Sequence, residues 1–145
     1  MCWNQVRTLA VDLHAPRGAR MFFSAAMVEQ LGSGEAINTL IGDAQVVVSE
    51  IVSNAVKAGC TKLLMQITIH RRRVRISVYD NADGLPIMVA PDPAAERGRG
   101  MTIVNALANS WGIETGHDGK EVWAEFRLSS RTGRILARCD QPTSV

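Results

Sequence analysis

The sequence predicts an α+β fold, a two-layer α/β sandwich in which helices pack on one face of a mixed, mainly antiparallel sheet. Two segments of alternating apolar residues, 63–70 and 74–80, are separated by three arginines, which is typical of an antiparallel hairpin. Two helical patterns precede this hairpin, so the elements lack the strict alternation of a parallel doubly wound sheet. The length of 145 residues is typical of one domain, expected over 1–128, followed by a flexible polar tail over 129–145.

The N-terminal half predicts one strand and two helices. Alternating apolar residues over 7–13 favour a half-buried strand. A first helix is expected over 17–31, closed by the Gly-Ser-Gly sequence at 32–34. Asn38 is expected to cap a second helix, in which apolar residues recur every three or four positions until Ala58.

The C-terminal half predicts a loop, a third helix and a second hairpin. The stretch 85–96 contains three prolines and no periodic pattern, which favours a mobile loop. A short helix is expected over 101–110. Apolar alternation then predicts strands over 111–115 and 122–128, joined by a tight turn over 116–119.

Composition narrows the class of protein. Hydrophobic residues make up 46% of the chain and charged residues 21%, an ordinary balance for a globular domain. The formal net charge of +2 is too small to indicate a nucleic-acid partner. The three cysteines are widely separated without metal-type spacing, and no charged start followed by a long apolar run is present at the N-terminus. These features predict a cytoplasmic protein with no membrane segment.

Glu50 and Asn54 form the first candidate site. They are four residues apart on the second expected helix, so both project from one flank of it, beside the apolar face. An asparagine carbonyl suits Mg²⁺, which keeps much of its water and bridges phosphate oxygens, while a neighbouring carboxylate can orient or deprotonate a hydroxyl. The alternative is a solvated helix edge that binds nothing.

Asp80 ends the second strand of the first hairpin. Every second residue from Val74 is apolar and is expected to be buried, and Asp80 follows at the same spacing of two. A buried carboxylate needs hydrogen-bond donors. Backbone amides would supply them if Asp80–Gly84 forms a turn, for which its residues are suited. The carboxylate could also accept from the exocyclic amine of adenine, with Gly84 letting the backbone approach the base. The two roles are compatible.

A glycine-rich segment precedes the third expected helix. Gly98 and Gly100 flank Arg99 immediately before Met101. Backbone without side chains can wrap a phosphate at a helix N-terminus, where unpaired amides and the helix dipole favour an anion. Arg97 and Arg99 would add positive charge. The alternative is a plain hinge, and the spacing is not that of a P-loop or a dinucleotide fingerprint.

Taken jointly, the segments that begin at Glu50, Asp80 and Arg97 resemble the N, G1 and G2 boxes of the ATPases that include gyrase and histidine kinases. Their order and separations are similar to those of that family. The short length, and the segments Ala108–Gly112 and Gly119–Phe126, most closely resemble the small bacterial anti-sigma-factor serine kinases.

The resemblance covers about residues 8–128 and implies the Bergerat-type ATP-binding fold, with ATP and Mg²⁺ as cofactors. Glu50 would be the catalytic base, Asn54 the Mg²⁺ ligand and Asp80 the adenine contact. The other implied nucleotide-binding residues are Gly84, Arg97, Gly98, Arg99, Gly100 and Met101. The implied partners are a sigma factor, which is held from RNA polymerase, and an anti-anti-sigma (STAS-type) protein, which is phosphorylated on serine or threonine. Many proteins of this family are homodimers.

Two positions depart from the family pattern. Ala82 stands where a glycine is usual, and Glu121 follows Lys120 where a threonine is common. A methyl group would crowd the base, and an acid near the phosphates would repel them unless it points away. Two functions therefore stay open: an anti-sigma-factor-type serine/threonine kinase, or a kinase-deficient module that only sequesters a sigma factor or another regulator. A third reading, a detached histidine-kinase catalytic domain, would need a phosphoacceptor helix from a separate chain.

Overall fold

The computed structural model describes residues 3–82 and 96–128, with side chains from Met101 onward in the second stretch. The expected loop 85–96 and tail 129–145 lie outside these residues, except for Glu96. The described elements follow the order β1 (Trp3–Thr8), α1 (Ala15–Leu31), α2 (Glu35–Lys57), β2 (Leu63–His70), β3 (Arg73–Asp80), α3 (Glu96–Leu107), β4 (Ser110–Gly116) and β5 (Gly119–Arg127).

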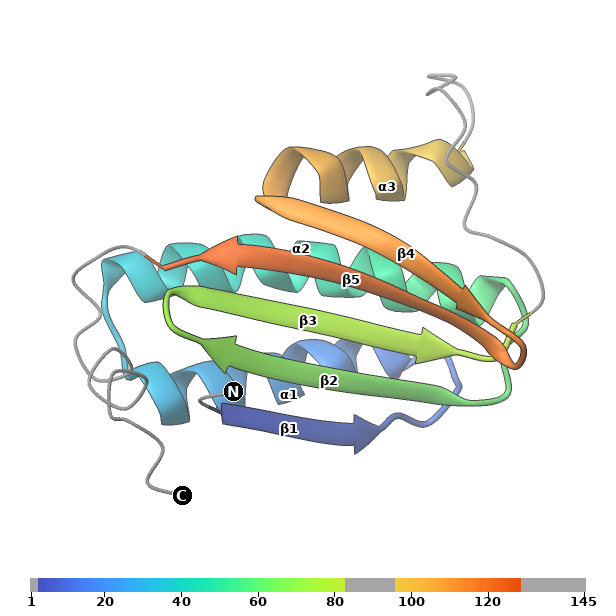
Figure 1. The fold of residues 1–145 in the computed structure, drawn as a ribbon, viewed down its shortest axis with the longest axis horizontal. Coiled ribbons are helices and arrows are strands. Elements are labelled where there is room, and N and C mark those ends of the chain that lie inside the picture. Colours follow the sequence, from blue (N-terminus) through green and yellow to red (C-terminus); the bar gives the residue numbers. More distant parts are fainter. Residues whose placement is uncertain (1–2, 83–95, 129–145) are drawn as a thin grey trace.

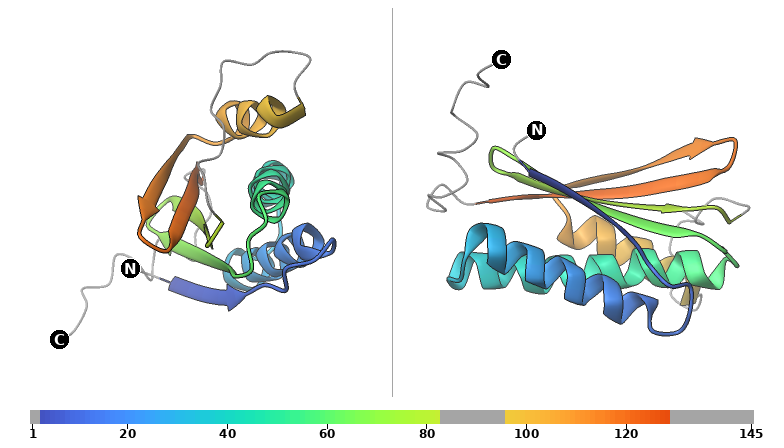
Figure 2. Two further views of the ribbon diagram at one scale, coloured as in Figure 1. Left: turned by 90° about the vertical axis from the view of Figure 1, so that its right-hand side faces the viewer. Right: turned by 90° about the horizontal axis from the view of Figure 1, so that it is seen from below.

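The strands form one sheet in the order β1-β2-β3-β5-β4, and all four pairings between described strands are antiparallel. The described helices all lie on one side of this sheet, and none of them covers its other face, which is called the open face below (Figures 1 and 2). The predicted two-layer α+β fold is therefore confirmed. None of the described helices combines the length and the apolar character that crossing a membrane requires.

The core lies between the sheet and the helices. Alternate residues of the central strands are buried on the helix side, as the period of two in their sequences predicts. From the helix layer, Phe23 and Met27 of α1 and Val48 and Val52 of α2 are fully buried. The strand residues buried on the helix side are Leu63, Met65, Ile67, Ile69, Val74, Ile76, Val78, Asp80, Lys120, Val122, Ala124 and Phe126.

The first strand lies earlier in the chain than its apolar pattern suggests. β1 ends at Thr8, where it pairs with Leu64 of β2. The expected strand over 7–13 is therefore wrong beyond its first two residues, and Leu13 is 91% exposed. The chain leaves the sheet because the Asp12 carboxylate accepts a hydrogen bond from the His14 backbone, at 2.7 Å, which turns it into α1.

The two long helices both begin before their expected starts. Ala15, with Pro16 in the first turn, opens α1 two residues before Arg17. Asn38 does not cap α2, which begins at Glu35 after Gly34. An acidic residue in the first turn favours this earlier start because it interacts well with the helix dipole.

α3 begins at Glu96 rather than at Met101, so the backbone of Arg97–Gly100 is helical. The expectation of a glycine-rich loop at this position is wrong. Glycine costs a helix about 1 kcal/mol per residue, and that cost favoured the loop interpretation. α3 packs on α2 with Met101 and Val104 buried, and this packing outweighs the local preference.

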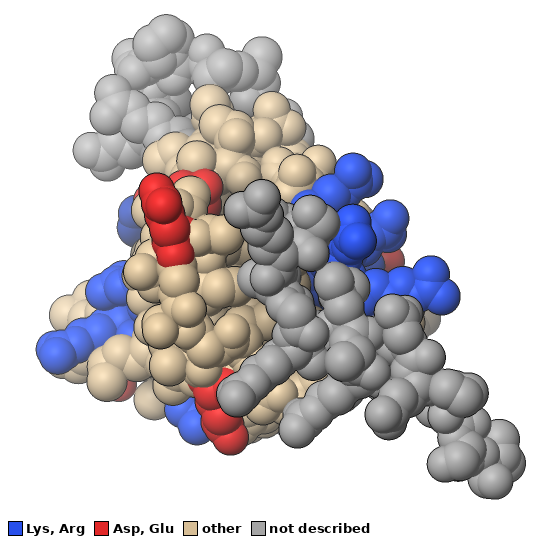
Figure 3. All heavy atoms as spheres, turned by 90° about the vertical axis from the view of Figure 1, so that its left-hand side faces the viewer, with Lys and Arg blue, Asp and Glu red and all other residues tan. Residues whose placement is uncertain are grey.

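The two expected hairpins are confirmed. β2 and β3 turn at Arg71 and Arg72, where Arg71 has a positive φ of 56°. β4 and β5 turn between Gly116 and Gly119. Three arginines, Arg71–Arg73, lie at the β2–β3 turn, and Figure 3 shows Lys and Arg side chains on both sides of the molecular end that carries this turn. This basic turn lies at the opposite end of β3 from Asp80.

Candidate functional site

Segments that are far apart in the sequence meet at one end of the sheet. β3 ends there at Asp80 and α2 ends there at Lys57, near the turn between β4 and β5, and α3 begins toward the same end of the molecule (Figure 1). Asn81 ties two of these segments together. Its side-chain oxygen accepts hydrogen bonds from the backbone N–H groups of Thr61 and Lys62, at 2.8 and 2.9 Å, and its amide donates to the Thr61 hydroxyl at 2.7 Å.

The first and third predicted signatures are in contact. The Asn54 side-chain amide donates to the Met101 sulfur at 3.8 Å, which joins α2 to α3. Because the amide nitrogen makes this contact, the carbonyl oxygen of Asn54 is left for another partner. Glu50 lies one turn earlier on the same flank of α2 and is half-buried. Glu50 forms no hydrogen bond or ion pair with any residue that the structure describes.

Asp80 occupies the buried phase of β3, as its sequence predicts, and is only 1% exposed. Its Oδ1 accepts a hydrogen bond from the Ala82 backbone N–H at 2.9 Å, so the expected turn contact is present. A second donor is the Lys120 ammonium, whose Nζ lies 2.9 Å from the same oxygen. Two donors therefore satisfy Oδ1, and neither uses Oδ2.

Lys120 is the site residue whose contact sequence reasoning missed. It lies opposite Asp80 in the β3–β5 pairing and is 5% exposed. The signal was present in the sequence, because Lys120 shares the buried phase of Val122 and Ala124 along β5. A lysine in that phase must find a partner, and a carboxylate directly across the strand pair is the strongest candidate.

Cys60 lies buried near this ion pair, between α2 and β2. Burial raises the pKa of the Cys60 thiol above its usual 9.0, and the charge of Asp80 raises that pKa further, while Lys120 lowers it. The thiol is consequently neutral near pH 7, which makes it a weak nucleophile. Cys60 contributes packing beside the carboxylate rather than reactivity.

The two departures from the family pattern have different structural settings. Ala82 is 7% exposed, and its backbone holds the Asp80 carboxylate. Glu121 pairs with Tyr79 and Glu114 on the neighbouring strands. Because side chains alternate between the two faces of β5, Glu121 lies on the face opposite to that of Lys120. Glu121 therefore points to the open face of the sheet, away from the helices and from Asp80.

The remaining predicted residues are placed only in part. Gly84 lies outside the described residues. Arg97, Gly98, Arg99 and Gly100 are described by their backbone alone, in the first turns of α3.

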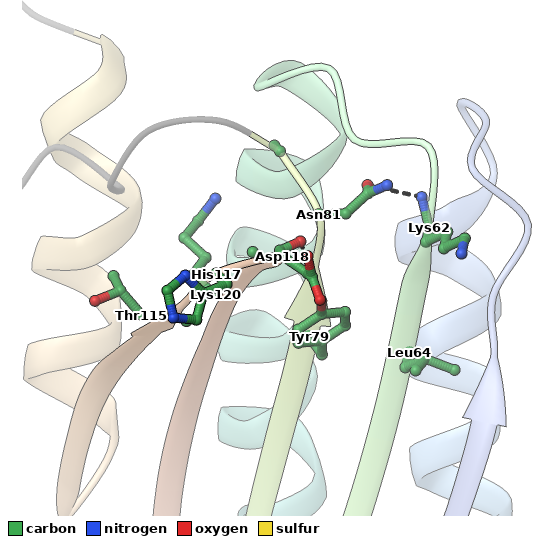
Figure 4. A pocket seen from close by; sticks show the side chains of 11 residues that line it. Lys62, Leu64, Tyr79, Asn81, Thr115, His117, Asp118 and Lys120 are labelled. Carbon is green, nitrogen blue, oxygen red and sulfur yellow. Dashed lines mark hydrogen bonds between the residues drawn. The ribbon is translucent and has the colours of Figure 1, made fainter.

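A hollow of about 920 Å³ adjoins this end of the sheet (Figure 4). Ala82 and Lys120 border it, together with Tyr79 and His117. The α2 residues of the first signature do not line it, because the hollow extends over the open face of the sheet. The Tyr79 hydroxyl donates to the Asp118 carbonyl at 3.1 Å and holds the β4–β5 turn in place. In Figure 4 the Lys120 side chain extends from β5 away from Tyr79.

The donor set at Asn54 fits Mg²⁺ only in partnership with a ligand. Within residues 3–82 and 101–128, no three His, Cys, Asp or Glu side chains gather into a ready cation site. One amide oxygen would leave most of the coordination shell to water and phosphate oxygens, which is the arrangement that Mg²⁺ favours in nucleotide sites. The residues present are thus suited to a nucleotide-bound cation rather than to a free one.

Comparisons with known proteins agree with this geometry. A family described as the histidine kinase-like ATPase domain matches residues 9–126. The structure of the RsbU and RsbW domains of Rv1364c from Mycobacterium tuberculosis is similar with a TM-score of 0.65 at 22% identity, covering 87% of this chain and 32% of that one. The histidine kinase domain of the blue-light activated histidine kinase EL346 from Erythrobacter litoralis gives a TM-score of 0.52 at 20% identity, covering 87% and 67%.

Because both sequence identities are low, these two similarities show the fold and nothing about activity. The chain spans about a third of the length of the Mycobacterium tuberculosis protein chain that it resembles. No curated protein matches the sequence.

Proposed function

Since this chain belongs to the family of histidine kinase-like ATPase domains, we propose that it binds ATP with Mg²⁺ and acts as a regulatory kinase of the anti-sigma-factor type. Its substrate would be a serine or threonine of an anti-anti-sigma (STAS-type) partner, and its other partner a sigma factor. The order of the three signatures and the resemblance of the C-terminal hairpin to these kinases support the proposal. The proposal also includes a cytoplasmic location for the protein and its assembly into a homodimer.

Each residue of the proposed site has a task that its position allows. The Asn54 carbonyl oxygen would hold the cation, because its amide nitrogen already contacts Met101. Glu50, half-buried on the same flank of α2, would accept the proton of the attacking hydroxyl. Asp80 would accept a hydrogen bond from the adenine amine. When bound, Mg²⁺ would neutralise charge on the phosphates during transfer.

The observation that carries the proposal is the pair formed by Glu50 and Asn54. A half-buried carboxylate without a partner among the described residues lies one helical turn from an amide whose oxygen is left for a ligand. Both residues offer oxygen acceptors on the same flank of α2, one helical turn apart, so one ligand could contact both.

One observation favours the second candidate, a module that binds its partner without phosphate transfer. Ala82 stands where a glycine is usual and adds a buried methyl group beside Asp80. This methyl group would lower the affinity for a nucleotide while leaving the surface of the domain intact.

Phosphate transfer to a purified anti-anti-sigma protein distinguishes the two candidates. The wild type, γ-labelled ATP and Mg²⁺ are expected to label the partner, and Glu50→Gln is expected to reduce the rate about 10²- to 10⁴-fold, the usual contribution of a general base. Glu29→Gln is a matched control, because Glu29 is an exposed carboxylate on α1.

Co-purification completes this test. Binding of a sigma factor without labelling of any anti-anti-sigma protein would favour the binding module. Labelling that Glu50→Gln leaves unchanged would remove Glu50 from the proposed catalytic role.

A further inference from the structure

Lys120 is a buried cation at the end of the sheet where β3 ends and the candidate site lies. Its side chain is 6% exposed and that of Asp80 is 2% exposed, and the two lie directly opposite each other on β5 and β3. Their 2.9 Å contact is shorter than the ion pairs that Arg73 and Arg75 form with Glu125 on the open face. The pair therefore belongs to the helix side of the sheet, where the candidate site lies.

Stability alone does not explain a buried pair of this kind. Removing two charges from water costs several kcal/mol per ion, and apolar residues of similar size often replace such pairs without loss. The surrounding positions of both strands are apolar, for example Val78 on β3 and Val122 on β5. A lysine and an aspartate in this phase instead place one donor and one acceptor side by side.

The contact leaves hydrogen-bonding capacity on both partners. An ammonium group has three N–H bonds, and the Asp80 contact uses one of them. The carboxylate has two oxygens, and both Lys120 and Ala82 donate to Oδ1. A ligand that approaches the pair would thus meet an acceptor, Oδ2, next to a positively charged donor.

We propose that Lys120 reads the nucleobase together with Asp80. The edge of adenine carries an amino group next to the ring nitrogen N1, which is an acceptor. The amino group would donate to Asp80 while Lys120 donates to N1. Guanine presents the opposite order at these two positions, a carbonyl oxygen and then an N–H group, so it would face like partners. Lys120 would then make the site selective for adenine.

This inference rests on the proposed ATP site, and a comparison of two nucleotides tests it in the unmodified protein. The triphosphate of 1-deazaadenosine keeps the amino group and replaces N1 by C–H. Titration calorimetry of the wild type with Mg²⁺ is expected to show binding about 10- to 100-fold weaker than that of ATP, the usual value of a hydrogen bond to a charged group. Equal affinities would overturn the role of Lys120 while leaving the ATP site intact.

A variant assigns the effect to Lys120. In Lys120→Met the preference for ATP over the 1-deaza analogue is expected to vanish, because the donor to N1 is gone. Lys62→Met is the matched control, since Lys62 is an exposed lysine that lines the adjoining hollow and forms no ion pair with Asp80. A preference that persists in Lys120→Met would overturn the proposal.

Folding of the variant is addressed separately. Lys120→Met leaves a buried carboxylate without its cation, so Asp80→Asn/Lys120→Met, which removes both charges, serves as the second variant. Circular dichroism checks that this double variant is folded, and calorimetry is expected to show that it has lost the preference for ATP over the 1-deaza analogue. A preference that persists in the folded double variant would count against the proposal. If the wild type binds neither nucleotide, the proposed function itself fails and this inference falls with it.

Discussion

Gly119 lies so close to the backbone of Asp80 that a methyl group on it would overlap the Asp80 carbonyl oxygen. Its φ of 153° is also a conformation that other residues rarely adopt. The start of β5 thus presses on the strand residue that carries the candidate carboxylate, and only glycine permits this approach. We expect Gly119→Ala to lower the free energy of unfolding by about 2 to 4 kcal/mol, from backbone strain and overpacking.

Urea unfolding followed by circular dichroism measures this loss. Gly42→Ala is the matched control, because Gly42 is exposed within α2 with nothing near its missing methyl group. It should raise stability by about 0.5 to 1 kcal/mol, since alanine favours a helix. Equal effects of the two substitutions would contradict the close approach at Asp80.

Cys60 should make stability depend on pH in the alkaline range. Burial and the Asp80 charge raise the pKa of its thiol in the folded state above the usual 9.0, so folding favours the protonated form. The corresponding stability is fully present below about pH 9 and is lost as pH rises through the folded-state pKa. Urea midpoints of wild type and Cys60→Ala, measured from pH 7 upward, should diverge only above pH 9. Parallel curves would show that the thiol is not perturbed.

Ala82→Gly should bring the site closer to the family pattern and improve nucleotide binding. Removing the buried methyl group beside Asp80 is expected to strengthen ATP binding by about 1 kcal/mol, roughly fivefold. The same change should lower stability by about 1 to 2 kcal/mol through lost burial and added backbone freedom. Calorimetric titration and urea unfolding measure the two effects. Weaker ATP binding in a folded variant would mean that the methyl group does not crowd the base.

Glu121→Thr should leave ATP affinity unchanged within about twofold, the usual range for a surface substitution. The side chain lies on the open face of the sheet, opposite to Lys120 and the helix layer. Water on that face would screen its charge from bound phosphates. A large gain in affinity in the same titration would place Glu121 near the phosphates after all.

Much of the fold could be predicted because the period of two in β2, β3 and β5 survives in the folded chain. The same period correctly predicted that the Asp80 side chain is buried. The start of β1 could not be found, because its residues from Asn4 to Thr8 are exposed at a sheet edge and include a single apolar residue, Val6. The early start of α3 was hidden by its glycines, whose cost is offset by packing on α2.

The candidate site was only partly visible in the sequence. The spacing of Glu50 and Asn54 predicted their common flank on α2, since four residues make about one helical turn. The pairing of Lys120 with Asp80 depends on which strands become neighbours, and β5 joins β3 only after α3 and β4 have intervened. Such a contact between residues 40 positions apart follows from the sheet order rather than from local pattern.

Titration of ATP into the wild type, with Mg²⁺ and with the cation chelated, tests the central claim most directly. We expect saturable binding that Mg²⁺ strengthens, and Asn54→Ala should weaken it about tenfold and remove the effect of Mg²⁺. Asn38→Ala, an exposed asparagine on the same helix, should bind as the wild type does. The absence of saturable ATP binding by the folded wild type would contradict the nucleotide site.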